Sequence, residues 1–120
     1  MSSSRVDLTD EAAVAEWASD VAAKHGQIHI LYANAAVTRF APVDQLTFAD
    51  WKWNVEHEMD VVFLPVKYFW PQLIQASNPA IVLVGSTAGA TGSMTNGRLA
   101  SYVTGANLMV DGGWSAVLPG

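Results

Sequence analysis

The chain has 120 residues, of which 51% are hydrophobic, and such a chain can bury a core and form one domain. Its net charge is -5 and its six Lys and Arg residues are scattered. Because phosphate binding needs clustered cations, nucleic acids and anionic membranes are not expected as partners, and the absence of cysteine excludes disulfides and thiolate metal sites.

No segment has the features of a signal peptide or of a membrane span. The first five residues are not followed by an apolar stretch, and the most apolar segment, Val61–Ile74, is short and interrupted by two prolines and a lysine. We therefore expect a cytoplasmic protein without a membrane-spanning helix.

The first predicted element is a helix between Thr9 and Gly26. Thr9 can cap its N-terminus, and Gly26 is a natural stop. Apolar residues recur between them at three- and four-residue steps, which predicts one stripe facing a core. This stripe consists of Val14, Trp17, Ala18 and Val21.

A short apolar run, Ile28–Tyr32, follows the first helix. It is rich in β-branched and aromatic residues, and the small-residue turn Ala33–Ala36 closes it. This pattern predicts a buried parallel strand.

Thr47 begins a second predicted helix, with Asp50 three residues later as a carboxylate version of the capping box. The helical pattern runs to about Gln75. Pro65 and Pro71 should kink or end it, because each removes an amide donor and crowds the preceding turn, so one continuous straight helix is not expected.

Two further strands are predicted. Ala80–Val84 contains no polar residue, as expected for a strand covered on both faces by helices, and Asn107–Val110 is a weaker example that Asp111–Gly113 closes. No segment between them has helical periodicity, although parallel neighbours normally need a helical crossover. The order of elements implies an α/β domain with a parallel sheet.

The glycine-rich segment Gly85–Gly92 could be a phosphate cradle, because it follows a strand. Its spacing is G-x-x-x-G-x-x-G, and Ser93–Arg98 does not look like the start of a helix. An ordinary loop at the carboxyl end of a strand is the favoured interpretation.

Four pieces of the chain together resemble the short-chain dehydrogenase/reductase family from its third strand onward. The most specific is Val103–Trp114, because V-T-G-A-x-L-x-V-D-G-G is a common ending of that family. The other pieces are Val6–Thr9, Asn34–Ala36 and Ile81–Gly89. The resemblance implies an α/β fold with a Rossmann-like parallel sheet flanked by helices in three layers, present in residues 1–120 as a single partial domain.

The resemblance also implies a function. Members of the family transfer hydride between the nicotinamide of NAD or NADP and a small alcohol or ketone. An Asp that contacts adenine in the family carries over to Asp7, an Asn beside the cofactor ribose carries over to Asn34, and Ala36 stands where the family has a Gly. From the residues alone, Asp7 would be a pre-helix acid and Asn34 a turn residue.

Ser86 matches the catalytic Ser of the family, whose hydroxyl stabilises the charge that develops on the substrate oxygen. It follows a predicted strand at its carboxyl end, where α/β sheets bind ligands. The alternative is a loop hydroxyl with no catalytic role.

Glu58 falls within the apolar stripe of the second helix, at a position where the family usually has an Asn. A carboxylate there must reach a polar cavity, find a partner or bind a proton. We expect Glu58 to line the substrate cavity with a raised pKa, unless a rotation or kink of the helix turns it to solvent. The stripe consists of Trp51, Val55, Glu58, Val62, Val66, Phe69 and Leu73.

Two catalytic parts of the family are not recognisable. The family has a Tyr general acid with a Lys four residues later, but Tyr102 is followed at that distance by Ala106. The pyrophosphate-binding glycine loop should precede Asp7, where only six residues stand. The sequence therefore predicts an oxidoreductase that is impaired or inactive in this form, or alternatively a non-catalytic truncated pseudoenzyme or partner-binding fragment.

Other partners follow from the resemblance and from spacing. In the family, the kinked helix and the D-G-G ending contribute to oligomer contacts, so a homo-oligomer is expected. The residues His25, His29 and His57 lack metal-ligand spacing, so no metal site is expected.

Overall fold

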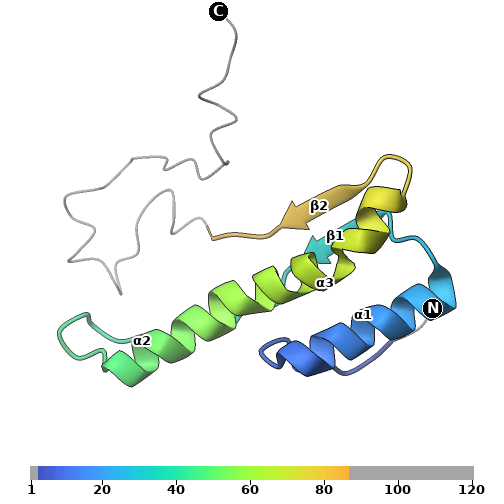
Figure 1. The fold of residues 1–120 in the computed structure, drawn as a ribbon. Coiled ribbons are helices and arrows are strands. Elements are labelled where there is room, and N and C mark those ends of the chain that lie inside the picture. The colour runs from blue at the N-terminus through green and yellow to red at the C-terminus, as the bar shows by residue number, and fades with distance from the viewer. Residues whose placement is uncertain (1–2, 87–120) are drawn as a thin grey trace, which may run out of the picture. The chain divides into compact units, whose positions relative to one another are not determined.

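Helices and strands alternate along residues 3–86, the part of the chain that the computed structural model describes. The order is α1 (Glu11–His25), β1 (Ile30–Ala33), α2 (Phe48–Val55), the π-helical turn η1 (Glu56–Asp60), α3 (Val61–Gln75) and β2 (Ala80–Leu83) (Figure 1). By its contacts the chain divides into two units. Residues 1–40 and 46–85 form the first unit, which contains all of these elements, and residues 41–45 and 86–120 form the second.

Several predictions lie outside the described residues. They concern the glycine-rich segment beyond Ser86, Tyr102, the strand Asn107–Val110 and its closing turn Asp111–Gly113.

The two strands pair in parallel. Their register runs from Ile30 opposite Ala80 to Ala33 opposite Leu83. Backbone hydrogen bonds extend the pairing on both sides, since the Ala80 N–H donates to the His29 carbonyl (2.8 Å) and the Val84 N–H donates to the Ala33 carbonyl (3.0 Å). The predicted parallel strands are therefore confirmed, with bounds shifted by up to two residues.

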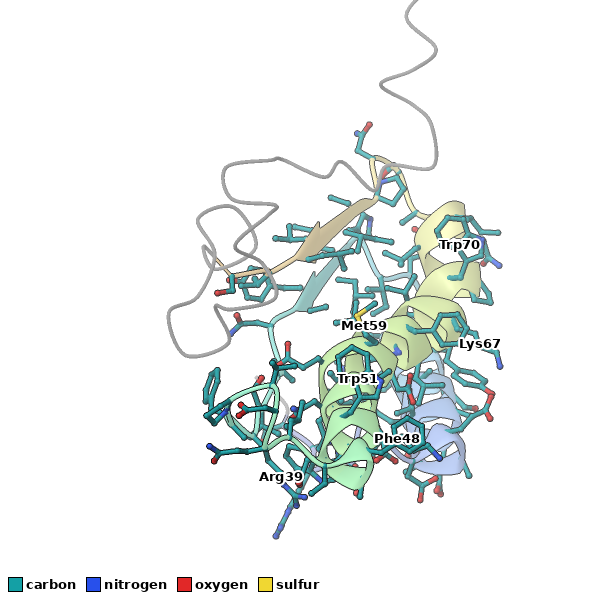
Figure 2. The ribbon with its side chains drawn as sticks, turned by 90° about the vertical axis from the view of Figure 1, so that its left-hand side faces the viewer. Arg39, Phe48, Trp51, Met59, Lys67 and Trp70 are labelled. Atoms are coloured by element: carbon teal, nitrogen blue, oxygen red, sulfur yellow. The ribbon has the colours of Figure 1, made fainter. Side chains whose placement is uncertain are left out.

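The sheet is covered on one face within the described residues. Helices α1 and α3 lie on the same side of the two strands (Figures 1 and 2). Leu31 points toward them and is 9% exposed, whereas its neighbours Ile30 and Tyr32 are 65% and 62% exposed. Val82 is also exposed. The prediction that both strand faces are buried is wrong here, because alternate residues face opposite sides and the described helices cover one of them.

Helix α1 begins one residue later than predicted. Its N-cap is Asp10, whose carboxylate accepts hydrogen bonds from the backbone N–H groups of Ala12 and Ala13. Thr9 is not the cap, because its hydroxyl donates to the Asp7 carboxylate instead (2.7 Å). The predicted end is confirmed, since Gly26 has a φ of +72° and its N–H donates to the Ala22 carbonyl in the last turn.

The core lies between α1, α3 and β1. The predicted stripe of α1 is confirmed, with Val14 and Ala18 buried and Trp17 and Val21 partly buried. Trp17 meets the Phe69 ring edge to face, with 4.8 Å between the ring centroids. The central buried residues are Ala18, Leu31, Phe69 and Leu73.

The second helix starts and ends as predicted but is interrupted elsewhere. The Thr47 hydroxyl accepts from the Asp50 N–H (3.0 Å), and helical structure runs to Gln75. Pro65 and Pro71 lie inside α3 and do not end it, since each removes only one backbone donor from a helix that also packs on α1 and β1. The interruption is η1, upstream of both prolines.

Three polar side chains, Glu11, Lys67 and Tyr68, join α1 to α3 at the surface, and we call them the Glu11 clasp. One carboxylate oxygen of Glu11 accepts from the Lys67 ammonium and from the Tyr68 hydroxyl, both at 2.7 Å. These bonds lower the pKa of Glu11, the Lys67 bond most, and the Glu11 carboxylate in turn raises the pKa of Lys67.

Candidate functional site

The carboxyl ends of β1 and β2 meet at one edge of the sheet, because the strands are parallel. Asn34 directly follows β1, and both Asn34 and Ala36 are exposed in the segment that leaves this edge. Ligands of open α/β sheets bind beyond the carboxyl ends of the strands. The described residues thus leave the two predicted cofactor residues accessible where a ligand would bind.

Asp7 precedes α1 and has an organised carboxylate. Its Oδ1 accepts hydrogen bonds from the Thr9 hydroxyl (2.7 Å) and the Thr9 N–H (3.0 Å). These bonds lower the pKa of Asp7, and the charge of His57 lowers it slightly further. Asp7 is therefore an ionised, exposed hydrogen-bond acceptor with a defined orientation.

Ser86 is the last described residue. It is exposed and lies three residues after the end of β2, in the second unit of the chain. Its predicted role at the substrate oxygen stays a prediction based on its position in the sequence.

Glu58 is exposed on the π-helical turn. A π-helical turn holds more residues per turn than an α-helix, so it changes the phase of an apolar stripe that crosses it. The predicted stripe accordingly divides in two: Phe69 and Leu73 are buried after the turn, whereas Trp51 is exposed before it. Glu58 is therefore exposed among the described residues, and its place in a substrate cavity stays a prediction.

A cluster of polar and aromatic side chains that sequence reasoning missed joins Arg39 to α2. The Arg39 guanidinium bonds Asp50 (Nη1 to Oδ1, 3.1 Å) and lies 3.9 Å from the centre of the Trp53 ring. The Asn54 side-chain amide forms two hydrogen bonds with the Arg39 backbone. The Trp53 ring stacks on the His57 ring, with 3.8 Å between the ring centroids. We call Arg39, Asp50, Trp53 and Asn54 the Arg39 clamp.

The electrostatics of the clamp start from Asp50. Hydrogen bonds from the Thr47 hydroxyl and then from Arg39 lower the pKa of Asp50, so the carboxylate is ionised and attracts the guanidinium. No local signal in the sequence marked the pairing of Arg39 with Asn54. The two residues are 15 positions apart, and Arg39 lies in the segment after β1 whereas Asn54 lies in α2.

Other classes of site find no support within residues 3–86. There, no group of three or more His, Asp or Glu side chains could hold a metal ion. In the same range, no helix is both long and apolar enough to cross a membrane. His25 and His29 are exposed, while His57 is partly buried against Trp53.

Comparisons with known proteins agree with the predicted family. A family model described as short chain dehydrogenase matches residues 2–105. D-threitol dehydrogenase of Mycolicibacterium smegmatis is 34% identical over 82 residues, which cover 68% of this chain and 32% of that protein. Cis-4-hydroxycyclohexanecarboxylate dehydrogenase of Sinomonas cyclohexanicum is 34% identical over 106 residues, which cover 87% of this chain and 43% of that protein.

A solved structure extends the likeness to three dimensions. The NADPH-bound short chain oxidoreductase of Pseudomonas aeruginosa PAO1, described as containing an atypical catalytic center, superposes with a TM-score of 0.72 at 28% identity. The match covers 75% of this chain and 35% of that one. It confirms the predicted Rossmann-like α/β fold. The chain spans less than half the length of each of these three relatives.

Proposed function

Because this chain belongs to the short chain dehydrogenase family, we propose that it is part of an NAD(P)-dependent oxidoreductase of the cytoplasm. The substrate class is a small alcohol or ketone, and the bound cofactor would supply or accept the hydride. The observation that carries the proposal is the parallel pairing of β1 and β2, with the exposed Asn34 directly after their shared carboxyl edge. The NADPH in the P. aeruginosa relative supports the cofactor class.

Each predicted site residue has a role in this proposal. The Asp7 carboxylate accepts a hydrogen bond from the adenine amino group, and Asn34 lies beside the ribose. Ala36 lies next to the cofactor, where its methyl group allows a less close approach of the backbone than the Gly of the family does. The Ser86 hydroxyl donates to the substrate oxygen, and Glu58 lies beside the substrate as a second polar group.

The described residues fit the nucleoside side of the cofactor better than its pyrophosphate. A pyrophosphate binds well at a helix N-terminus whose N–H groups are open to it. At α1, however, the Asp10 carboxylate already takes two of these N–H groups, and Glu11 adds negative charge in the first turn. At the N-terminus of α2, the Thr47 hydroxyl already accepts from the Asp50 N–H, and the Asp50 carboxylate adds negative charge in the first turn. We therefore propose weak nucleotide binding and impaired or absent turnover in this form.

Nucleotide titration tests this proposal. NADH and NADPH are titrated into the chain while nicotinamide fluorescence is followed, and oxidation is then assayed with assorted alcohols. We expect weak binding that Asp7→Asn weakens further, because the amide is a poorer acceptor than an ionised carboxylate. Asp20→Asn, on the exposed face of α1, is the matched control.

The outcomes separate the parts of the proposal. Equal effects of Asp7→Asn and Asp20→Asn would contradict the role of Asp7. The absence of any binding would contradict the dinucleotide site and favour the alternative, a non-catalytic fragment. Efficient turnover would contradict the proposed impairment.

A row of exposed apolar side chains supports the proposal of a homo-oligomer. It runs along the outer side of α2, η1 and α3, where Figure 2 shows Phe48, Trp51, Met59 and Trp70 along one long surface. Exposed apolar surface of this extent favours association. We call it the outer row, and it comprises Phe48, Trp51, Val55, Met59, Phe63, Trp70 and Ile74.

A second copy is the occupant that the sequence of the outer row favours. In an antiparallel pairing centred at the level of Val61, Phe48 of one copy lies opposite Ile74 of the other, and Met59 lies opposite Phe63. The same pairing sets Lys52 against the Trp70 ring, where a cation is attracted. A two-fold axis at this level would thus bring apolar side chains of the row near one another, with Lys67 opposite Val55.

Sedimentation velocity tests the homo-oligomer. We expect Phe63→Glu to shift the chain toward the monomer, because the pairing would bury the new charge near the axis. Ser19→Glu, on the exposed side of α1, is the control and should leave the distribution unchanged. A monomeric parent chain, or equal effects of both variants, would contradict this pairing.

A further inference from the structure

The segment that leaves β1 carries two of the predicted cofactor residues, Asn34 and Ala36, and forms no helix or strand. Such a segment must be held by its ends or by its neighbours if it is to present side chains in one arrangement. One end is held at the sheet, where the Ala33 carbonyl accepts from the Val84 N–H (3.0 Å). The other end is held at Arg39, five positions after Asn34.

Asn54 on α2 holds the backbone at Arg39 through a reciprocal pair of hydrogen bonds. Its Oδ1 accepts from the Arg39 N–H at 2.8 Å, and its Nδ2 donates to the Arg39 carbonyl at 3.0 Å. Both main-chain groups of one residue are therefore satisfied by one amide, which fixes the orientation as well as the position of that part of the segment.

The Arg39 side chain adds a second attachment to the same helix. Its guanidinium bonds Asp50 and lies over the Trp53 ring, as described above. The Trp53 ring is itself held, because it stacks on His57, whose Nδ1 donates to the Trp53 carbonyl at 2.8 Å. Figure 2 shows Arg39 near the N-terminal end of α2. Two independent contacts thus meet on one turn of α2.

We infer that the Arg39 clamp, and Asn54 in particular, positions the segment after β1 for nucleotide binding. Asn54 is a positioning residue that acts through Arg39 and does not touch the nucleotide. With both ends held, the four residues between Asn34 and Arg39 can adopt few arrangements, so Asn34 and Ala36 are presented in advance of binding. This inference rests on the proposed function, because it assigns the nucleotide to that segment.

The place of the clamp outside the core separates this role from general stability. Arg39 is exposed, the other three clamp residues are partly buried, and α2 contributes no buried residue to the core. Loss of a clamp contact should therefore release the segment without unfolding the chain.

The test compares three variants of the full chain. Asn54→Leu has a similar size but can make neither hydrogen bond, and Asn54→Asp keeps an acceptor for the Arg39 N–H and loses the donor. Gln75→Leu is the matched control, because it makes the same type of change at an exposed position on α3. Amide exchange, backbone ¹⁵N relaxation and NADPH affinity are measured for each.

We expect Asn54→Leu to speed exchange of the Arg39 amide about tenfold, as the loss of a net hydrogen bond implies. The backbone order parameters of residues 35–38 should fall from about 0.85 toward 0.6, the values typical of rigid and mobile backbone. NADPH affinity should fall by about tenfold while the denaturation midpoint stays unchanged. Asn54→Asp should give an intermediate exchange rate, and Gln75→Leu should change none of these quantities.

Failure of the inference and failure of the proposed function give different results. If the parent chain binds no NADPH, the proposed function fails, and the inference that the segment is prepared for a nucleotide fails with it. If the parent chain binds NADPH but Asn54→Leu binds it equally well, the inference alone is overturned. Unchanged order parameters at residues 35–38 in Asn54→Leu, or equal changes in Gln75→Leu, would also overturn it.

Discussion

The two halves of one long helical stretch, α2 and α3, differ in whether their apolar side chains are buried. After η1, α3 packs on α1 and β1 and buries apolar side chains such as Phe69 and Leu73. Before it, α2 carries Phe48 and Trp51, which are just as apolar, yet no residue of α2 or η1 is buried, and both elements are described throughout. An apolar pattern indicates which side of a helix seeks a partner, and the tertiary structure decides whether a partner lies there.

The two halves are also attached by different chemistry. Apolar packing and the Glu11 clasp hold α3, whereas polar contacts from the Arg39 clamp hold α2. We therefore expect changes in α3 to affect the stability of the whole chain and changes in α2 to have local effects.

The largest difference should come from truncating one apolar side chain in each half. Leu73 in α3 is 2% exposed, so Leu73→Ala should lower the free energy of unfolding by about 2–5 kcal/mol through lost burial and a cavity. Trp51→Ala in α2 should change it by no more than about 0.5 kcal/mol at chain concentrations low enough to keep the monomer, since association would bury Trp51. Urea denaturation followed by circular dichroism measures both, and comparable losses would break the comparison.

The turn between α1 and β1 should be the next most sensitive position. Gly26 has a φ of +72°, which a side chain disfavours even though an added Cβ would meet no atom within 4 Å. Gly26→Ala should therefore cost about 1–2 kcal/mol of unfolding free energy. Gly85→Ala is the control, since that glycine has neither a positive φ nor a close neighbour. Thermal unfolding of the pair gives the answer, and equal midpoints would contradict the strain argument.

Removing a helix cap should have global consequences in one half only. Asp10→Ala and Thr47→Ala each remove a side chain that caps a helix, which costs about 1 kcal/mol locally. Because α1 belongs to the core, Asp10→Ala should lower the denaturation midpoint. Thr47→Ala should instead speed amide exchange in the first turn of α2 and leave the midpoint almost unchanged. A lower midpoint in Thr47→Ala would show that α2 unfolds together with the core.

The Glu11 clasp should make the smallest contribution, and it should depend on pH. The folded pKa of Glu11 is lowered, so its stabilisation is present above the unfolded pKa and is lost as pH falls through the lowered value. The folded pKa of Lys67 is raised, so its contribution is present below the unfolded pKa and is lost as pH rises through the raised value.

Melting temperatures of the parent chain and Glu11→Gln measure this dependence. Between about pH 5 and pH 3, the parent chain should lose slightly more stability than the variant, since only the parent has this carboxylate to protonate. The same should hold at strongly alkaline pH, where Lys67 loses its charge. Parallel curves over both ranges would mean that this surface clasp contributes nothing measurable.

Features that depend on neighbouring residues could be predicted from the amino-acid sequence. Thr47 and Gly26 mark helix ends because caps act within one turn, and the two apolar runs mark strands because their side chains suit a pleated surface. The motifs also identified the family, since a family resemblance is carried by residues along the chain. The observed cap of α1, Asp10, directly follows the predicted cap, Thr9, whose hydroxyl bonds the Asp7 carboxylate instead.

Which faces are covered and which polar groups meet could not be predicted before the fold was known. Ile30 and Leu31 are equally apolar, but the helices lie on the side of Leu31. Glu58 is exposed because a π-helical turn changes the phase of a stripe that would otherwise be continuous. The pairing of Asn54 with Arg39 joins residues 15 positions apart. The covered sheet face and the Asn54–Arg39 pair depend on how distant segments approach one another, and periodicity along the chain carries no information about that approach.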